Sequence, residues 1–61
     1  MITKTYYLEN TNKANKRINK IIDNFMCFVE TKMIEMNYIE VEIKCRVEDI
    51  KTIEELISDL V

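Results

Sequence analysis

The chain has 61 residues, of which 48% are hydrophobic and 33% are charged, and its formal net charge is −2. This length allows one small domain, residues 1–61, and this composition is typical of a globular chain rather than a disordered one. The chain contains no His, Gly, Pro or Trp, which argues against glycine-loop nucleotide binders and against most catalytic and zinc sites.

Residues 1–9 predict a strand, because β-branched and aromatic residues dominate this segment and alternate between two faces. One face would carry Ile2, Lys4, Tyr6 and Leu8, and the other would carry Thr3, Thr5 and Tyr7. Residues 10–12 follow with Asn and Thr side chains, whose oxygens can cap the start of a helix.

Residues 12–36 predict one long helix with a wide apolar stripe. The residues of this stripe are Ala14, Ile18, Ile21, Ile22, Phe25, Met26, Phe28, Val29, Met33 and Met36. Lys32 falls within the same arc and is expected to extend its ammonium group to the edge. Asn37 follows, and Asn is the best residue in a glycine-free chain for a left-handed helix end.

Residues 38–47 alternate without interruption between apolar and polar side chains, which predicts a strand with one buried and one solvated face. Residues 49–61 predict a second helix with its own apolar stripe, capped by Asp49 or by Thr52.

These elements predict an α+β fold with the order β-α-β-α and both helices on one face of a two-stranded sheet. A strand, a helix and a strand usually form a parallel unit, and an antiparallel pair is the alternative. Two strands alone are marginal, and a domain of this size buries only about 60% of its unfolded surface. We therefore expect a homodimer or a complex with another protein, and dimerisation through strands would give a four-stranded sheet.

Catalysis and cofactor binding have little support in the residues. Cys27 and Cys45 belong to no paired motif and have no His to complete a zinc site. We therefore predict no enzymatic activity, no metal and no cofactor. No apolar run approaches the length of a membrane span, and residues 1–5 lack the apolar stretch of a signal peptide, so a cytoplasmic location without membrane contact is expected.

A basic cluster is the sharpest functional signal. Lys13, Lys16, Arg17 and Lys20 lie within eight residues that contain no acid. As helical neighbours they repel one another, by about 0.2–0.5 kcal/mol for each pair. An anionic partner, either nucleic acid or an acidic protein patch, would relieve this repulsion, whereas the plain alternative is a solvated lysine face.

Acidic and aromatic residues complete the candidate partner-binding set. Residues 37–61 carry seven acids and three bases, a net charge of −4. Tyr7 and Tyr38 are expected on the solvated sheet face, where exposed Tyr is a common interface anchor. The further candidates are Glu40, Glu42, Glu54 and Glu55. An overall negative chain is not a typical nucleic-acid binder, so nucleic acid is a possible partner but not the favoured one.

The expected function is therefore a non-enzymatic module that binds a protein partner by occupying its surface. Ile, Lys and Asn fill 23 of the 61 positions, and all three have A/T-rich codons. This composition and size favour an inhibitor of a host defence complex from a phage or mobile element, similar in kind to anti-CRISPR proteins. The alternatives are a nucleic-acid-associated regulator that uses the basic helix face and a structural homo-oligomer.

Overall fold

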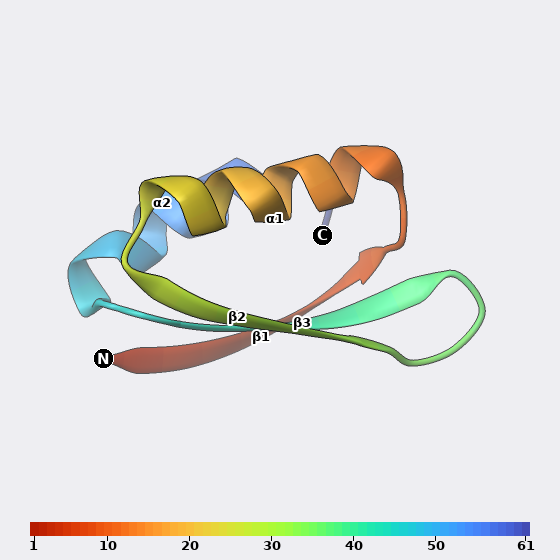
Figure 1. Ribbon diagram of the computed structural model, residues 1–61, viewed down its shortest axis with the longest axis horizontal. Coiled ribbons are helices and arrows are strands. Elements are labelled where there is room, and N and C mark those ends of the chain that lie inside the picture. The colour runs from red at the N-terminus through yellow and green to blue at the C-terminus, as the bar shows by residue number, and fades with distance from the viewer.

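A three-stranded antiparallel sheet carries two helices on one of its faces in the computed structural model, which describes all 61 residues (Figure 1). The elements are β1 (Ile2–Glu9), α1 (Asn12–Asn24), β2 (Cys27–Met33), β3 (Tyr38–Cys45) and α2 (Val47–Ile57). The strand order is β1-β3-β2, so β3 is central and runs antiparallel to both of its neighbours.

The predicted order β-α-β-α and the predicted two-stranded sheet are wrong, because the chain folds as β-α-β-β-α. The helix expected over 12–36 ends at Asn24, and Cys27–Met33 forms a strand instead. Phe25 already has extended backbone angles, and its N–H donates to the carbonyl of Ile21 (3.1 Å). The new strand, β2, supplies hydrogen-bond partners for the backbone groups on the second edge of β3. A two-stranded sheet would have left those groups without backbone partners.

Of the two pairings that the strand-helix-strand order leaves open, the structure has the antiparallel one, which joins β1 to β3. β1 and β2 do run in the same direction, but β3 lies between them. The tight connection from β2 to β3 reverses the chain at Glu35, where the backbone N–H of Tyr38 donates to the Glu35 carbonyl (3.0 Å). Met36, rather than the expected Asn37, takes the left-handed conformation, with φ of 51°.

The two helices begin differently. α1 begins as the sequence indicates, because the Thr11 hydroxyl accepts a hydrogen bond from the N–H of Ala14 (3.1 Å). α2 begins two residues before the predicted start, after Arg46, and has no side-chain cap. Glu48 and Asp49 instead lie in its first turn, where negative charge interacts favourably with the helix dipole.

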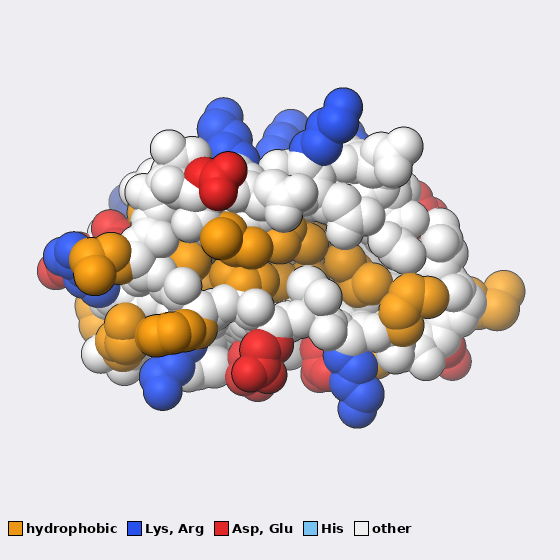
Figure 2. Space-filling model, viewed as in Figure 1, with side chains coloured by type: hydrophobic (Ala, Val, Ile, Leu, Met, Phe, Trp, Pro, Cys, Tyr) orange, Lys and Arg blue, Asp and Glu red, His pale blue; other side chains and the backbone are white.

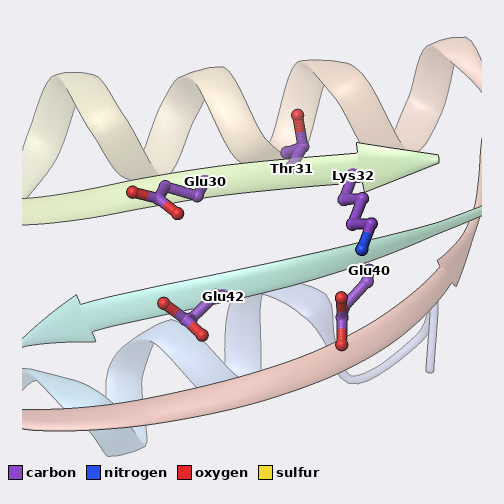
Figure 3. Close-up of a pocket in the computed structure, with 5 residues that line it drawn as sticks. All are labelled: Glu30, Thr31, Lys32, Glu40 and Glu42. Atoms are coloured by element: carbon purple, nitrogen blue, oxygen red, sulfur yellow. The ribbon is translucent and has the colours of Figure 1, made fainter. Parts of the chain in front are cut away.

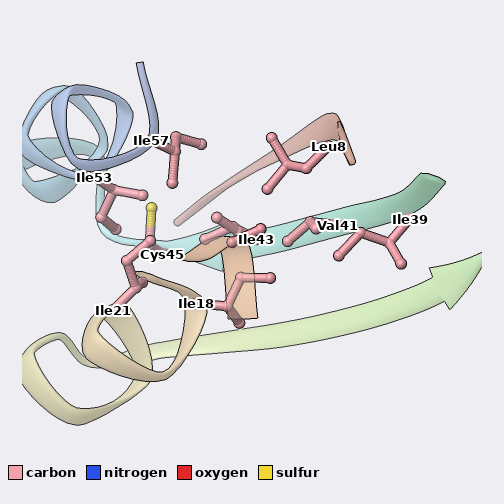
Figure 4. Close-up of a cluster of buried hydrophobic side chains, with 10 residues drawn as sticks. Leu8, Ile18, Ile21, Ile39, Val41, Ile43, Cys45, Ile53 and Ile57 are labelled. Carbon is pink, nitrogen blue, oxygen red and sulfur yellow. The ribbon is translucent and has the colours of Figure 1, made fainter. Parts of the chain in front are cut away.

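The core lies between the sheet and the helices (Figure 4). Ile39, Val41, Ile43 and Cys45 are the alternate residues of β3 that face this layer, and each is buried. The remaining members of the buried cluster are Leu8, Ala14, Ile18, Ile21, Ile53 and Ile57. No polar or charged residue is buried, so every charged, hydroxyl and amide side chain of the protein reaches the surface, and the Cys45 thiol is the one reactive group in the core.

Candidate functional site

The face of the sheet that turns away from both helices has no covering layer (Figure 1). Its residues alternate with the core-facing residues on all three strands. We call this surface the open sheet face, and it comprises Thr3, Thr5, Tyr7, Glu9, Phe28, Glu30, Lys32, Tyr38, Glu40, Glu42 and Lys44. Four acids and two bases give it a net charge of −2.

Three aromatic side chains are exposed on the open sheet face. Phe28 is 68% exposed, Tyr7 is 57% exposed and Tyr38 is 48% exposed. The Tyr7 hydroxyl donates to Glu40 Oε1 (3.3 Å), directly across the β1–β3 pair. Aromatic side chains that combine a large apolar surface with low conformational entropy are common anchors of protein interfaces.

An acidic hollow lies beside these aromatic residues. Its volume is about 110 Å³, and Glu30, Thr31, Lys32, Glu40 and Glu42 line it (Figure 3). Glu30 lies directly opposite Glu42, and Lys32 lies opposite Glu40. In Figure 3 the Thr31 side chain points toward the helix layer, away from Glu30 and Glu42.

The hollow is electrostatically unbalanced. Like charges directly opposite each other on neighbouring strands are destabilising, and Glu30 and Glu42 form no ion pair with any cation of the chain. No group of three or more His, Cys, Asp or Glu side chains is placed to hold a metal ion. The arrangement therefore suits a cationic group supplied by a binding partner.

The predicted basic cluster divides into two parts in the structure. The Arg17 guanidinium donates to Asp59 Oδ1 (2.7 Å) and Oδ2 (3.1 Å), and also to the carbonyl oxygen of Leu56 (2.6 Å). Lys13 Nζ lies 3.2 Å from Asp59 Oδ2. These hydrogen bonds, from Arg17 first and then from Lys13, lower the pKa of Asp59 from 3.8 to about 2. Lys13 and Arg17 thus join α1 to the end of α2.

Lys16 and Lys20 form no ion pair within the chain. Figure 2 shows blue Lys and Arg side chains along the upper edge of the molecule, over the helix layer. The two lysines therefore remain as the free cations of the predicted cluster, on the side of the molecule opposite the open sheet face.

The predicted acidic candidates on α2 lie in the helix layer. Glu54 Oε2 accepts a hydrogen bond from the hydroxyl of Tyr6 (2.9 Å), which ties α2 to β1. Burial and then this hydrogen bond raise the pKa of Tyr6. Glu55 is exposed, and only its backbone carbonyl accepts bonds, from Ser58. Tyr7, Tyr38, Glu40 and Glu42 are thus the predicted partner-binding residues that share the open sheet face.

Sequence reasoning missed Phe28, Glu30 and Lys32, because it assigned them to a helix. The signal that identifies them is alternation. Residues 27, 29 and 33 are apolar and face the core side, while Phe28, Glu30 and Lys32 occupy the intervening positions. A strand with this pattern adds one aromatic residue and one acid to the same surface as Tyr7 and Glu40.

Neither thiol has the lowered pKa of a reactive cysteine. The Cys27 Sγ donates weakly to the Ile21 carbonyl (3.8 Å), and Cys45 is fully buried, as its alternation with polar neighbours predicts. Burial is the main cause that raises the pKa of both thiols. A nucleophilic Cys requires the opposite shift.

Comparison with known proteins identified no match among family models, curated proteins or solved structures. Neither helix combines the length and the apolarity that crossing a bilayer requires.

Proposed function

We propose that this protein is a non-enzymatic binding module that occupies the surface of another protein with its open sheet face. The observation that carries the proposal is the combination of Phe28, Tyr7 and Tyr38, all exposed on one uncovered sheet face, with the unpaired acids Glu30 and Glu42. In the free protein this surface leaves apolar area in water and like charges side by side. A bound partner would remove both sources of instability.

The chemistry of the surface favours a particular class of partner. The hollow and its surroundings are acidic, so a complementary protein surface presents Lys or Arg side chains. The aromatic residues lie around the hollow and not within it, so apolar contacts would surround the central charge contact. An Arg is the best-suited central group, because its guanidinium can bind two carboxylates and stack on an aromatic ring.

Two features support a binding role over an enzymatic one. The raised pKa of Cys27 and of Cys45 keeps both thiols protonated. The acidic hollow is small and contains no aromatic or apolar side chain, whereas substrate pockets are usually larger and mostly apolar.

The nucleic-acid alternative has less support. Two of its four expected phosphate contacts, Lys13 and Arg17, are held by Asp59 of the same chain. The remaining pair, Lys16 and Lys20, is a small basic patch on a chain of net charge −2. The finer prediction, an inhibitor from a phage or mobile element that acts on a host defence complex in the cytoplasm, rests on size and composition and remains a prediction.

Affinity capture with matched surface variants tests the proposal. The variant Phe28→Ala with Tyr38→Ala removes two exposed anchors, and the variant Lys16→Ala with Lys20→Ala removes the free cations on the opposite side. We expect the wild-type protein to retain one partner from a lysate of its native cell. Loss of a buried aromatic anchor from an interface typically weakens binding by about 2 kcal/mol, roughly 30-fold, so the aromatic variant should release that partner.

The lysine variant should retain the same partner at the wild-type level. Circular dichroism of both variants checks that the fold is intact, since all four side chains are exposed. Loss of the partner from the lysine variant alone would contradict the proposal, and so would capture of nucleic acid that nuclease treatment removes.

A further inference from the structure

We propose that the free edge of β2 is a self-association surface, which pairs antiparallel with the β2 strand of a second copy and joins two sheets into one of six strands. The size of the chain alone predicts a homodimer, and the structure adds to this prediction an edge, a register and a set of contacts. The proposal goes beyond the partner-binding role of the open sheet face, and each can hold without the other.

The hydrogen-bond pattern between β2 and β3 shows which backbone N–H and C=O groups of β2 are free to pair with a second copy. The N–H of Ile34 donates to the carbonyl of Tyr38 (3.3 Å), which continues the β2–β3 register by one pair. Hydrogen-bonded and non-hydrogen-bonded pairs alternate in an antiparallel ladder. The backbone groups of residues 28, 30 and 32 are therefore used by β3, and those of Val29, Thr31 and Met33 point to the free edge.

The other free edge, on β1, is protected. Its core-side residues include Lys4, which is exposed. An inward-pointing charge on an edge strand is a common device against edge pairing. The core-side residues of β2 are Cys27, Val29, Thr31 and Met33, and none of them is charged. β2 therefore has the edge on which a second strand can be added without burying a charge.

Charge complementarity selects the register. With the two-fold axis at Thr31, Glu30 lies opposite the partner's Lys32 and Lys32 lies opposite the partner's Glu30. Moving the axis to Glu30 would place two glutamates opposite each other, and moving it to Lys32 would do the same with two lysines. In the Thr31 register Val29 also lies opposite the partner's Met33, and each odd-numbered pair exchanges two backbone hydrogen bonds.

Apolar surface lies along the same side of the molecule. Figure 2 shows orange side chains between the helix layer at the top and the sheet below. Ile22 on α1 is 48% exposed and Met33 on β2 is 62% exposed. Because Lys13 and Arg17 face α2, helical spacing places Asn15, Asn19 and Ile22 on the opposite flank of α1, toward the β2 side. Asn15, Asn19 and Ile22 carry no charge, and Asp23 beside them is the only acid of α1. The uncharged stretch of α1 is therefore the part that can approach a second copy above the joined strands.

The test substitutes proline for one residue of a free edge at a time, which removes the backbone N–H at that position. Thr31→Pro removes an N–H that β3 does not use, so the folded chain tolerates it as edge strands do. Thr5→Pro is the matched control, because the bond from the Asn10 N–H to the Asn37 carbonyl places the N–H of Thr5 on the free edge of β1. In sedimentation equilibrium the wild type and Thr5→Pro should have twice the 7.3 kDa mass of the chain at micromolar concentration.

The Thr31→Pro variant should sediment as a monomer, with a dissociation constant raised at least about 30-fold, because both copies lose a central donor. A monomeric wild type at these concentrations would overturn the proposal, and so would a dimer that Thr5→Pro abolishes and Thr31→Pro does not. Amide hydrogen exchange gives a readout that does not depend on a variant. The N–H groups of Val29, Thr31 and Met33 should become protected as concentration rises, and those of Thr3, Thr5 and Tyr7 should not.

The register has its own test. Glu30→Lys alone and Lys32→Glu alone each place like charges across the two-fold axis, and each should weaken the dimer. The combined variant Glu30→Lys with Lys32→Glu restores both opposite-charge pairs and should recover most of the lost affinity. Recovery would support the Thr31-centred register, and a double variant weaker than both single variants would overturn it.

Discussion

Arg17 is the residue that decides what the basic segment of the chain can do. Its guanidinium donates hydrogen bonds to both carboxylate oxygens of Asp59 and to the carbonyl of Leu56. One side chain of α1 thus holds the C-terminal end of α2 in place. A bidentate arrangement of this kind suits Arg and not Lys. A cluster that the sequence presents as four free cations thus contains a structural contact, and Lys13 supports the same carboxylate.

The titration of Asp59 tests this contact. Its pKa in the folded chain is about 2, compared with an ordinary value of 3.8. Because the folded-state pKa is the lower one, the stabilisation is present above about pH 4 and is lost as the pH falls toward 2. In a carbon-13 NMR titration of the side-chain carboxyl, we expect a midpoint near 2 in the wild type and a clearly higher midpoint in Arg17→Ala.

Lys13→Ala is the graded comparison for this titration. It should raise the midpoint less than Arg17→Ala does, because the Arg17 hydrogen bond is the larger cause of the lowered pKa. A wild-type midpoint near the ordinary value would show that the contact does not form in solution.

The two helices differ in how their charged side chains are placed relative to the helix dipole and to one another. α1 has no acid in its first turn, and Lys13, Lys16 and Lys20 are spaced as helical neighbours. Lys13 is compensated by Asp59, whereas Lys16 has no ion-pair partner. α2 has the opposite arrangement, with Glu48 and Asp49 in its first turn. The uncompensated cations on α1 are therefore Lys16 and Lys20, and Lys16 is the one with a cation on either side of it, Lys13 and Lys20.

Lys16→Glu should for this reason stabilise the free protein. The change removes two repulsions, with Lys13 and with Lys20, and places a carboxylate four residues before Lys20, which is the favourable order for a helical ion pair. We expect the free energy of unfolding to rise by about 1 kcal/mol in urea denaturation.

Lys13→Glu is the matched control for that measurement. It also adds a carboxylate to the first half of α1, but it removes the ion pair with Asp59 and sets two acids side by side. This variant should be less stable than the wild type. Equal stabilisation by both substitutions would indicate that general helix electrostatics, and not the Asp59 contact, controls this surface.

The sequence predicts some elements well and one poorly, for identifiable reasons. The strands Ile2–Glu9 and Tyr38–Cys45 could be predicted, because each has one face toward the core and one toward water. The segment after Asn24 could not, because Phe25, Phe28 and Val29 fit a helical stripe as well as a strand. The pairing of β2 with β3 decides between the two, and this long-range contact is not visible in local periodicity.

The whole molecule has two distinct sides. The helix layer carries the cations of α1, which are partly compensated within the chain, together with the acids of α2. The open sheet face carries acids without ion-pair partners and exposed aromatic residues. Tyr7, Tyr38, Glu40 and Glu42 could be predicted for this face, because alternation along two strands, unbroken in residues 38–47, indicates it. Phe28 and Glu30 could not, because their placement depends on a strand that sequence periodicity does not distinguish from a helix.

If two copies join through β2, their open sheet faces lie on the same side of one continuous sheet. A partner would then meet a surface twice as long, with two aromatic and acidic sites related by a two-fold axis. The dimer would therefore offer a partner two binding sites on one continuous sheet, whereas the monomer offers one.

Site-specific photocrosslinking tests the binding role of the open sheet face most directly. Benzoylphenylalanine in place of Tyr38 puts an aromatic crosslinker on the open sheet face, and the same group in place of Lys16 puts it on the helix layer. Both positions are exposed, so both variants should fold. After irradiation in the native cell, we expect a covalent adduct with one protein partner from position 38 and none from position 16. An adduct from position 16 only, or no adduct from position 38, would contradict it.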